Sequence, residues 1–166
     1  MSEASYGRHR KYMKFMHKNE AGQLHCTDGP ALKTVQGDVS WYINGKLHRD
    51  GGPALIQATG GVTWYEHGKI HREDGPASVE VDGSWTWYKH NRVHRVDGPA
   101  VWVARSKQSL WYIEGECLTD EQVQTCEKIL TADLKDLPLY MGNPLYKGVL
   151  RKRFLNEKEK GNRAGA

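Results

Sequence analysis

The chain repeats itself every 23 residues, and this period constrains its fold more than any other feature. The clearest markers are four histidines, three tryptophans with a fourth 24 residues on, and four Gly-Pro pairs: His25, His48, His71 and His94; Trp41, Trp64, Trp87 and Trp111; Pro30, Pro53, Pro76 and Pro99. A fixed period between about 20 and 50 residues is typical of a repeat array. A residue present in every copy is expected to build the repeat unit, so the pattern disfavours a catalytic role for these side chains.

Each copy is expected to supply two strands. A copy opens with Gly-Pro-Ala and a strand-favouring run such as 55–58, turns, and continues into an aromatic run such as 62–65. The aromatic run ends in a two-residue turn that is Asn44-Gly45 in its first occurrence, the preferred pair for a type I′ hairpin. The later turns are His67-Gly68, His90-Asn91 and Glu114-Gly115. The predicted fold is mainly β, an elongated single-layer antiparallel meander with a C-terminal helix and a basic tail.

The two ends of the array depart from the repeat and divide the chain. Lys18 stands where tryptophan is due, and Cys117-Leu118-Thr119 replaces the usual Leu-His-Arg. Thr119 and Gln122 form a capping-box pattern that predicts a helix over 120–130. We therefore expect a basic N-terminal segment (1–20), a repeat sheet (21–116), a capping helix region (117–138) and an extended basic tail (139–166). Within the tail, 147–156 is expected to form a short basic helix when bound, and 157–166 is expected to be disordered.

Charge is segregated along the chain. Residues 1–18 carry a net charge of +4 and residues 147–166 of +5, so the total of +4 leaves −5 for the repeat body. Basic ends are either solvated tails or contacts for an acidic partner such as nucleic acid. The candidate contacts are Arg8, Arg10, Lys11, Lys147, Arg151, Lys152 and Arg153.

The periodic histidines do not predict a metal site. Equivalent positions lie two strands apart, roughly 9–10 Å at ~4.8 Å per strand, whereas ligands of one ion lie within about 3–4 Å of each other. A histidine beside an Asp-Gly corner is expected to bind turn backbone instead. No nucleophile elbow, P-loop or dinucleotide fingerprint occurs. We predict no metal, no cofactor and no enzymatic activity.

Three scattered cysteines do not make a disulfide framework, and they fit a reducing compartment. No apolar run reaches the ~18 residues of a membrane span. The protein is therefore expected to be intracellular, in the cytoplasm.

Alternation along the aromatic strand predicts two ladders on opposite faces. The tryptophans share parity with Val39 and Ile43 and are assigned to the more covered face. The tyrosine face, flanked by Ser40, Thr63 and Thr86, is expected to be the more exposed. Exposed aromatics anchor interfaces and arginines accompany them, which makes these residues the partner-binding candidates: Tyr42, Tyr65, Tyr88, Tyr112, Arg49, Arg72 and Arg95.

The aromatic strand, the Asn-Gly-Lys turn at 44–46, His48 and Gly52 resemble the MORN repeat family in their order and period. The resemblance covers about 21–115, and the copies differ from the family in carrying Arg-x-Asp-Gly-Pro-Ala. Similar variants occur in uncharacterised bacterial, phage and large-virus proteins. The resemblance implies an elongated single-layer sheet with a binding or scaffolding role, including that of a phage or viral accessory protein.

Two functions remain open from the sequence. One is a protein-interaction or scaffolding module that docks a protein partner or a second copy of itself. The alternative is a nucleic-acid-associated protein that binds through its basic ends. Salt separates them, because nucleic-acid binding weakens by decades between low and moderate salt.

Overall fold

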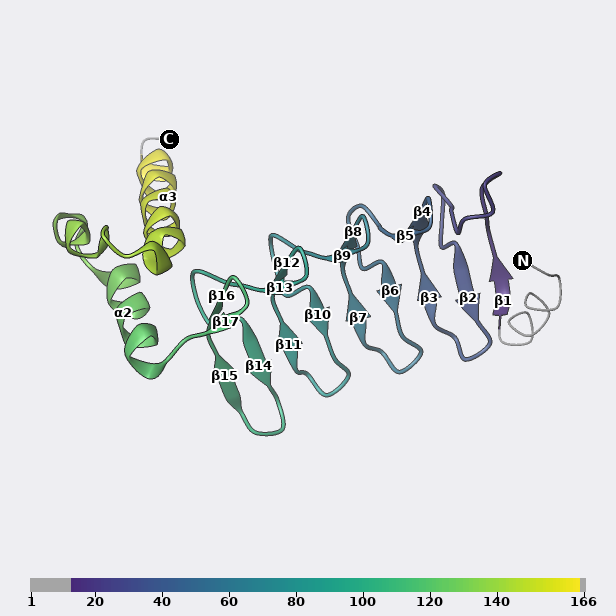
Figure 1. Cartoon of the computed structure of the whole chain (residues 1–166), viewed down its shortest axis with the longest axis horizontal. Helices are drawn as coiled ribbons and strands as arrows, with labels where there is room; N and C mark the ends of the chain where they lie inside the picture. Colours follow the sequence, from purple (N-terminus) through teal and green to yellow (C-terminus); the bar gives the residue numbers. More distant parts are fainter. Residues whose placement is uncertain (1–12, 165–166) are drawn as a thin grey trace.

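The computed structural model describes residues 13–164 and shows one long, thin sheet with helices beyond one end (Figure 1). Nine short antiparallel strands form the main sheet, each hydrogen-bonded to the next. In spatial order they are β1 (Met13–Met16), β2 (Leu32–Thr34), β3 (Val39–Ser40), β6 (Leu55–Ile56), β7 (Val62–Thr63), β10 (Ser78–Val79), β11 (Trp85–Thr86), β14 (Val101–Val103) and β15 (Gln108–Leu110). The predicted elongated antiparallel meander is therefore confirmed.

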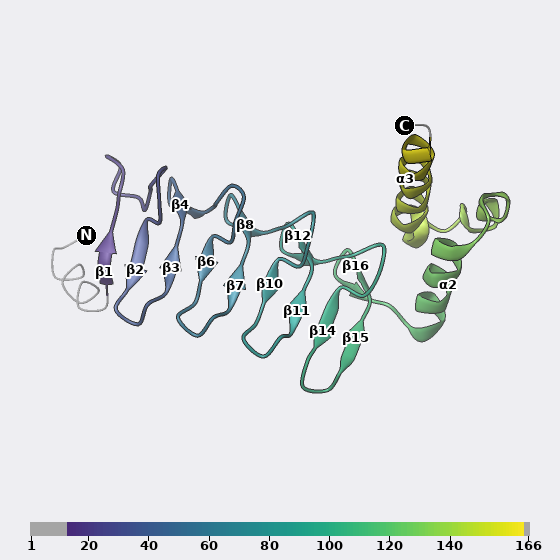
Figure 2. The same cartoon turned by 180° about the vertical axis from the view of Figure 1, so that it is seen from behind.

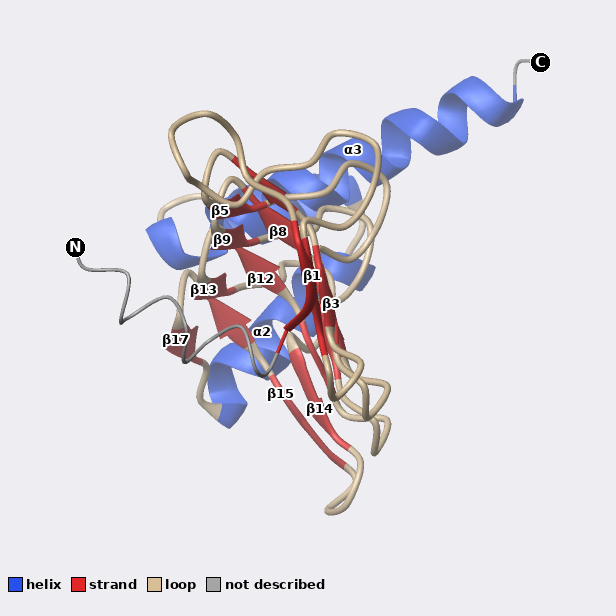
Figure 3. Ribbon diagram, turned by 90° about the vertical axis from the view of Figure 1, so that its right-hand side faces the viewer, coloured by secondary structure: helices blue, strands red, loops and turns tan. Residues whose placement is uncertain are grey.

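Each aromatic run bends at its tryptophan and does not continue as one strand. The Trp41 N–H donates to Ala54 O in the main sheet, while Trp41 O accepts from the His48 N–H. Trp64 and Trp87 repeat this division. The residues after each tryptophan consequently pair in separate small hairpins, which project to one side when the main sheet is seen nearly edge-on (Figure 3). The prediction of a single continuous aromatic strand was wrong at this corner.

The small hairpins are four two-stranded sheets. They comprise β4 (Tyr42–Ile43) with β5 (Lys46–Leu47), β8 (Tyr65–Glu66) with β9 (Lys69–Ile70), β12 (Tyr88–Lys89) with β13 (Arg92–Val93), and β16 (Tyr112–Ile113) with β17 (Glu116–Cys117). Both turn residues of every hairpin have positive φ, from +46° at His67 to +92° at Gly115. Positive φ at both positions is the requirement of a type I′ turn, so the predicted turn chemistry is confirmed.

The apolar core lies at the C-terminal end of the array. Helix α2 (Asp120–Thr131) begins at the predicted capping box, in which Thr119 and Gln122 bind each other's backbone N–H groups. Two 3₁₀ segments, η1 (Leu134–Tyr140) and η2 (Pro144–Tyr146), lead to helix α3 (Lys147–Ala164). The buried cluster joins the last hairpin to these helices: Trp111, Ile113, Leu118, Cys126, Ile129, Leu137, Tyr146, Val149 and Leu150. Seen from behind, the helices again lie past β15 and not over a sheet face (Figure 2).

The two ends of the chain differ from the sequence prediction. Residues Met13–Met16, assigned to a separate N-terminal segment, form β1 and pair with β2, so they take the place of an aromatic strand in the first half-copy. The tail expected to be extended is helical from Lys147 to Ala164. Val149 and Leu150 explain this helix, because they are buried in the core and give it an apolar surface to pack on. Residues 1–12 lie outside the described part of the chain.

Candidate functional site

An arginine and a tryptophan of the repeat form a clamp at three corners of the array. The guanidinium carbon of Arg49 lies 3.9 Å from the centre of the Trp41 ring, and Arg72 and Arg95 cover Trp64 and Trp87 at 4.2 and 4.3 Å. The same guanidinium donates to the carbonyl of the proline four residues on, at 3.2–3.4 Å in the three copies. Each arginine therefore fixes the corner through a cation–π contact and a charge-assisted hydrogen bond.

The glycine of each of the three later Gly-Pro pairs makes room for this clamp. A Cβ at Gly52, Gly75 or Gly98 would lie 3.1, 2.7 or 3.1 Å from the arginine's guanidinium carbon. The half-copy supplies a natural comparison. Cys26 replaces the arginine there, and a Cβ at Gly29 would meet no described atom within 4 Å.

The clamp determines how the arginines proposed as partner contacts are used. Arg72 also pairs with Asp74 at 2.8 Å, and Arg95 pairs with Asp97 at 2.8 Å. Asp74, which is exposed, has its pKa lowered by the hydrogen bond and charge of Arg72. Gly51 occupies the corresponding position in the copy of Arg49. The three arginines are thus engaged inside the repeat, which favours a structural role for them.

Three of the four repeated histidines join one hairpin to the next. Nδ1 of His25, His48 and His94 accepts from the backbone N–H of Asn44, His67 and Glu114, at 3.0–3.3 Å. The histidines do bind turn backbone, as expected, but the turn belongs to the next hairpin and not to the adjacent Asp-Gly corner.

The joint at His94 makes stability depend on pH. Burial lowers the pKa of His94 from its ordinary 6.5, with Glu114 opposing the shift and Lys89 adding to it. Because the folded-state pKa lies below the unfolded one, the unfolded chain binds more protons. The contribution of neutral His94 is therefore fully present above about pH 6.5 and is lost as pH falls through the folded pKa.

We expect the free energy of unfolding to fall between pH 7.5 and 5.5, measured by urea denaturation at a series of pH values. His94→Asn keeps an acceptor near the Nδ1 position without titrating, so it is expected to flatten this dependence. His67→Asn, at an exposed turn position, is the control and should leave the dependence as it is. An unchanged slope in the His94 variant would contradict the assignment.

The tyrosine candidates form a row at the first position of each hairpin. All four are partly buried, as are the first three tryptophans, so the two ladders do not divide into a covered and an open face. Ser40, expected on the open side, is buried. Burial raises the pKa of Tyr65, and the neighbouring Tyr42 and Tyr88 raise it further. The phenols of Tyr42, Tyr65 and Tyr88 thus lie near one another along successive hairpins. In the last hairpin the neighbouring Cys117 raises the pKa of Tyr112.

The basic candidates are only partly available. Arg8, Arg10 and Lys11 lie outside the described residues. Lys147 and Arg151 are exposed on α3. Lys152 lies 3.6 Å from Asp97, whereas Arg153 pairs with Glu157 and donates to Ala132 O at 3.1 Å. Of these four candidates on α3, Lys152 therefore attaches the helix to the array and Arg153 attaches it to the C-terminal end of α2.

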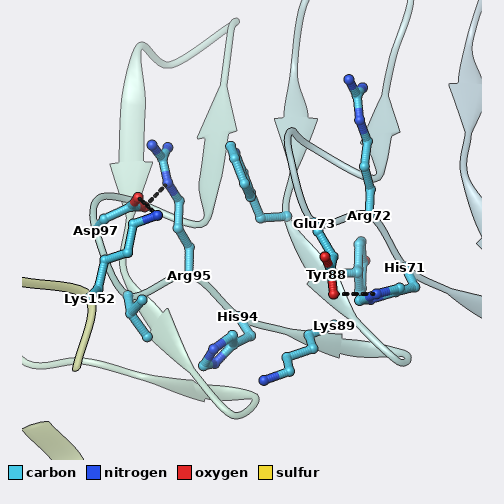
Figure 4. A pocket seen from close by; sticks show the side chains of 11 residues that line it. His71, Arg72, Glu73, Tyr88, Lys89, His94, Arg95, Asp97 and Lys152 are labelled. Atoms are coloured by element: carbon cyan, nitrogen blue, oxygen red, sulfur yellow. Dashed lines mark hydrogen bonds and ion pairs between the residues drawn. The ribbon is translucent and has the colours of Figure 1, made fainter. Parts of the chain in front are cut away.

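A pocket of about 210 Å³ marks the junction between α3 and the array (Figure 4). Lys152 reaches across it to Asp97, which Arg95 also binds. Gly148 allows this approach, since a Cβ there would lie 2.9 Å from Val96 Cγ1. The pocket thus contains the polar contacts that attach helix α3 to the last full copy of the repeat.

A second polar cluster was not predicted. Glu66, His71 and His90 place one donor atom each within 4.8 Å of the others. Glu66 belongs to the hairpin β8–β9, His71 follows it, and His90 lies in the turn of the next hairpin. The equal spacing of the four repeated histidines does not reveal the cluster, because His90 is not one of them. The sequence signal for this cluster is that Glu66 departs from the repeat. Ile43 and Lys89 stand at the equivalent positions of the neighbouring copies.

Comparison of the chain with protein-family models, curated proteins and solved structures finds no match. Within residues 13–164, none of the helices has a stretch long and apolar enough to cross a membrane.

Proposed function

We propose that the chain is a non-enzymatic interaction module whose elongated sheet binds a protein partner along the row of tyrosine-bearing hairpins. The observation that carries this proposal is the position of the core. The large apolar cluster runs from Trp111 to Leu150, whereas the buried apolar residues before it are four alanines: Ala31, Ala54, Ala77 and Ala100. Both faces of an array this thin serve as surface, and extended repeat surfaces are used for binding.

The repeated polar side chains support a binding role over catalysis. The three corner arginines hold tryptophan rings and proline carbonyls, and three of the four histidines hold turn backbone. The tyrosines remain as a row of equivalent, partly exposed aromatic groups, and such groups anchor protein interfaces. The resemblance to MORN repeats points the same way and stays a prediction.

The test compares partner capture by two variants of the full chain. One carries Tyr42→Ser, Tyr65→Ser and Tyr88→Ser in the hairpin row. The control carries Val35→Ser and Val81→Ser, which change the exposed far loops of the main sheet. Circular dichroism first establishes that both are folded, and light scattering gives the mass of each complex.

The proposal expects a saturable protein complex, or a defined self-complex, that the tyrosine variant loses and the valine variant keeps. Equal binding by both variants would place the interface elsewhere. A strictly monomeric protein without a partner would overturn the proposal. Capture of nucleic acid that weakens by decades between low and moderate salt would instead support the alternative function of the basic ends.

A further inference from the structure

We propose that Glu66, His71 and His90 bind one divalent transition-metal ion, with Zn²⁺ as the best fit, and that the ion ties the hairpin β8–β9 to the hairpin β12–β13. The donors are two imidazoles and one carboxylate, the nitrogen and oxygen ligands that zinc accepts. This inference does not depend on the proposed protein partner.

The separations within the cluster suit ligands better than hydrogen bonds. Glu66 Oε2 lies 3.6 Å from His90 Nδ1 and 3.9 Å from His71 Nε2. Hydrogen bonds between nitrogen and oxygen are about 2.7–3.2 Å long. Two ligands at about 2 Å from one ion lie roughly 3–4 Å apart. Glu73 Oε1, also 3.9 Å from His71 Nε2, is a further oxygen within reach of the fourth position.

His71 differs from the other repeated histidines. Its Nδ1 is buried and has no hydrogen-bond partner among the described residues, whereas Nδ1 of His25, His48 and His94 accepts from the next turn. Asn91, which replaces the usual turn glycine, instead accepts from the Ile70 N–H through its side chain. His71, which makes no such bond, is therefore the repeated histidine that lies beside Glu66, Glu73 and His90.

The preceding copy provides an internal comparison. His48 and His67 stack at 4.2 Å, as His71 and His90 stack at 4.1 Å. Ile43 stands in the preceding copy where Glu66 stands in this one, so that pair lacks the bridging carboxylate. A ligand set that occurs in one copy only is expected of a site, whereas a side chain that builds the unit recurs.

Metal binding requires a small rearrangement of the histidine pair. The two rings are inclined by only 17°, so their in-plane lone pairs lie in nearly parallel planes and do not converge on one point. One ring must turn to share an ion. His90 is the mobile partner, because 48% of its side chain is exposed against 11% for His71. Binding should therefore break the stack, which NMR detects as shifts of the His71 and His90 ring protons.

The experiment is a calorimetric titration of the untagged full chain with ZnCl₂, repeated for three variants. Glu66→Gln removes the carboxylate charge. His90→Asn removes a donor and copies Asn44, which adopts the same positive φ in the first hairpin. His67→Asn makes the identical change in the preceding copy. His71 is left unchanged because its burial makes loss of folding a competing explanation.

We expect one saturable zinc ion per wild-type chain, with Glu66→Gln and His90→Asn each weakening the affinity by about tenfold or more. His67→Asn should bind within about twofold of wild type. Zinc should also raise the melting temperature of wild type but not of His90→Asn, since a ligand of the folded state stabilises it.

Three results would overturn the site. The first is no saturable 1:1 binding below millimolar zinc. The second is an equal loss of affinity in His67→Asn and His90→Asn, or none in either variant. The third is a thiolate charge-transfer band on substitution with Co²⁺, which would assign the ion to a cysteine.

Discussion

Replacing Ile129 with alanine is expected to lower the free energy of unfolding by about 2–5 kcal/mol, the usual range for a buried isoleucine. Ile129 is fully buried in α2 and belongs to the cluster that joins Trp111, Leu118 and Val149. Removing the Ile129 side chain leaves a cavity where the C-terminal helices meet the array. Urea denaturation, followed by both circular dichroism and tryptophan fluorescence, measures the change.

Gln124→Ala is the matched control for Ile129→Ala. Gln124 is exposed on the same helix, and alanine is the better helix former, so its effect should stay within about 0.5 kcal/mol. A loss below about 1 kcal/mol in Ile129→Ala would mean that the core does not hold the cap in place. The two signals are also expected to separate in Ile129→Ala, because an array loses cooperativity when a terminal interface is weakened.

Gly75→Ala is expected to cost about 1–3 kcal/mol by displacing Arg72. The added Cβ would lie 2.7 Å from the Arg72 guanidinium carbon, a distance at which one of them must move. Arg72 would leave the Trp64 face and lose its bond to Pro76 O. A cation–π contact contributes about 0.5–2 kcal/mol and a charged hydrogen bond about 1.5–3 kcal/mol, and partial exposure reduces both.

The half-copy supplies the control for Gly75→Ala. Gly29→Ala makes the same change where Cys26 replaces the arginine, and should cost well under about 1 kcal/mol. A double-mutant cycle with Arg72→Ala tests the mechanism, because Gly75→Ala should add little once the arginine is gone. Equal costs for Gly29→Ala and Gly75→Ala, or full additivity in the cycle, would contradict displacement of Arg72.

Features set by neighbouring residues could be predicted from the sequence. Asn44-Gly45 and its counterparts form the expected turns because positive φ is a requirement of the turn residues themselves. The capping box at Thr119 is equally local, and α2 begins where it predicts.

Features set by distant partners could not be predicted in this way. The bend at Trp41 arises because its N–H and C=O bind different parts of the array, and nothing in residues 39–43 marks that division. The segment of α3 was expected to be an extended basic tail because charged residues dominate its composition. Its order depends on Val149 and Leu150 meeting a core built by other elements.

The candidate metal site shows the same limit more sharply. Its ligands occupy three different positions of the repeat, so aligning the copies separates them. Folding places the turn of one hairpin against the histidine of the previous one, as the bond from the Glu114 N–H to His94 also shows. In a repeat array, residues at unlike positions of adjacent copies can therefore form a site that the ladders of like positions do not reveal.

The joints between copies have a consequence for how such a chain changes length. Trp N–H to Ala O, and turn N–H to His Nδ1, each link one copy to the next and to no other. Duplication or deletion of a whole copy therefore preserves the Trp-to-Ala joints of the main sheet, and it changes that sheet by two strands, about 9–10 Å. Gain or loss of 23 codons would thus change the length of the sheet in fixed steps. Each step would alter the distance between the N-terminal edge strand and the C-terminal helices without altering either end.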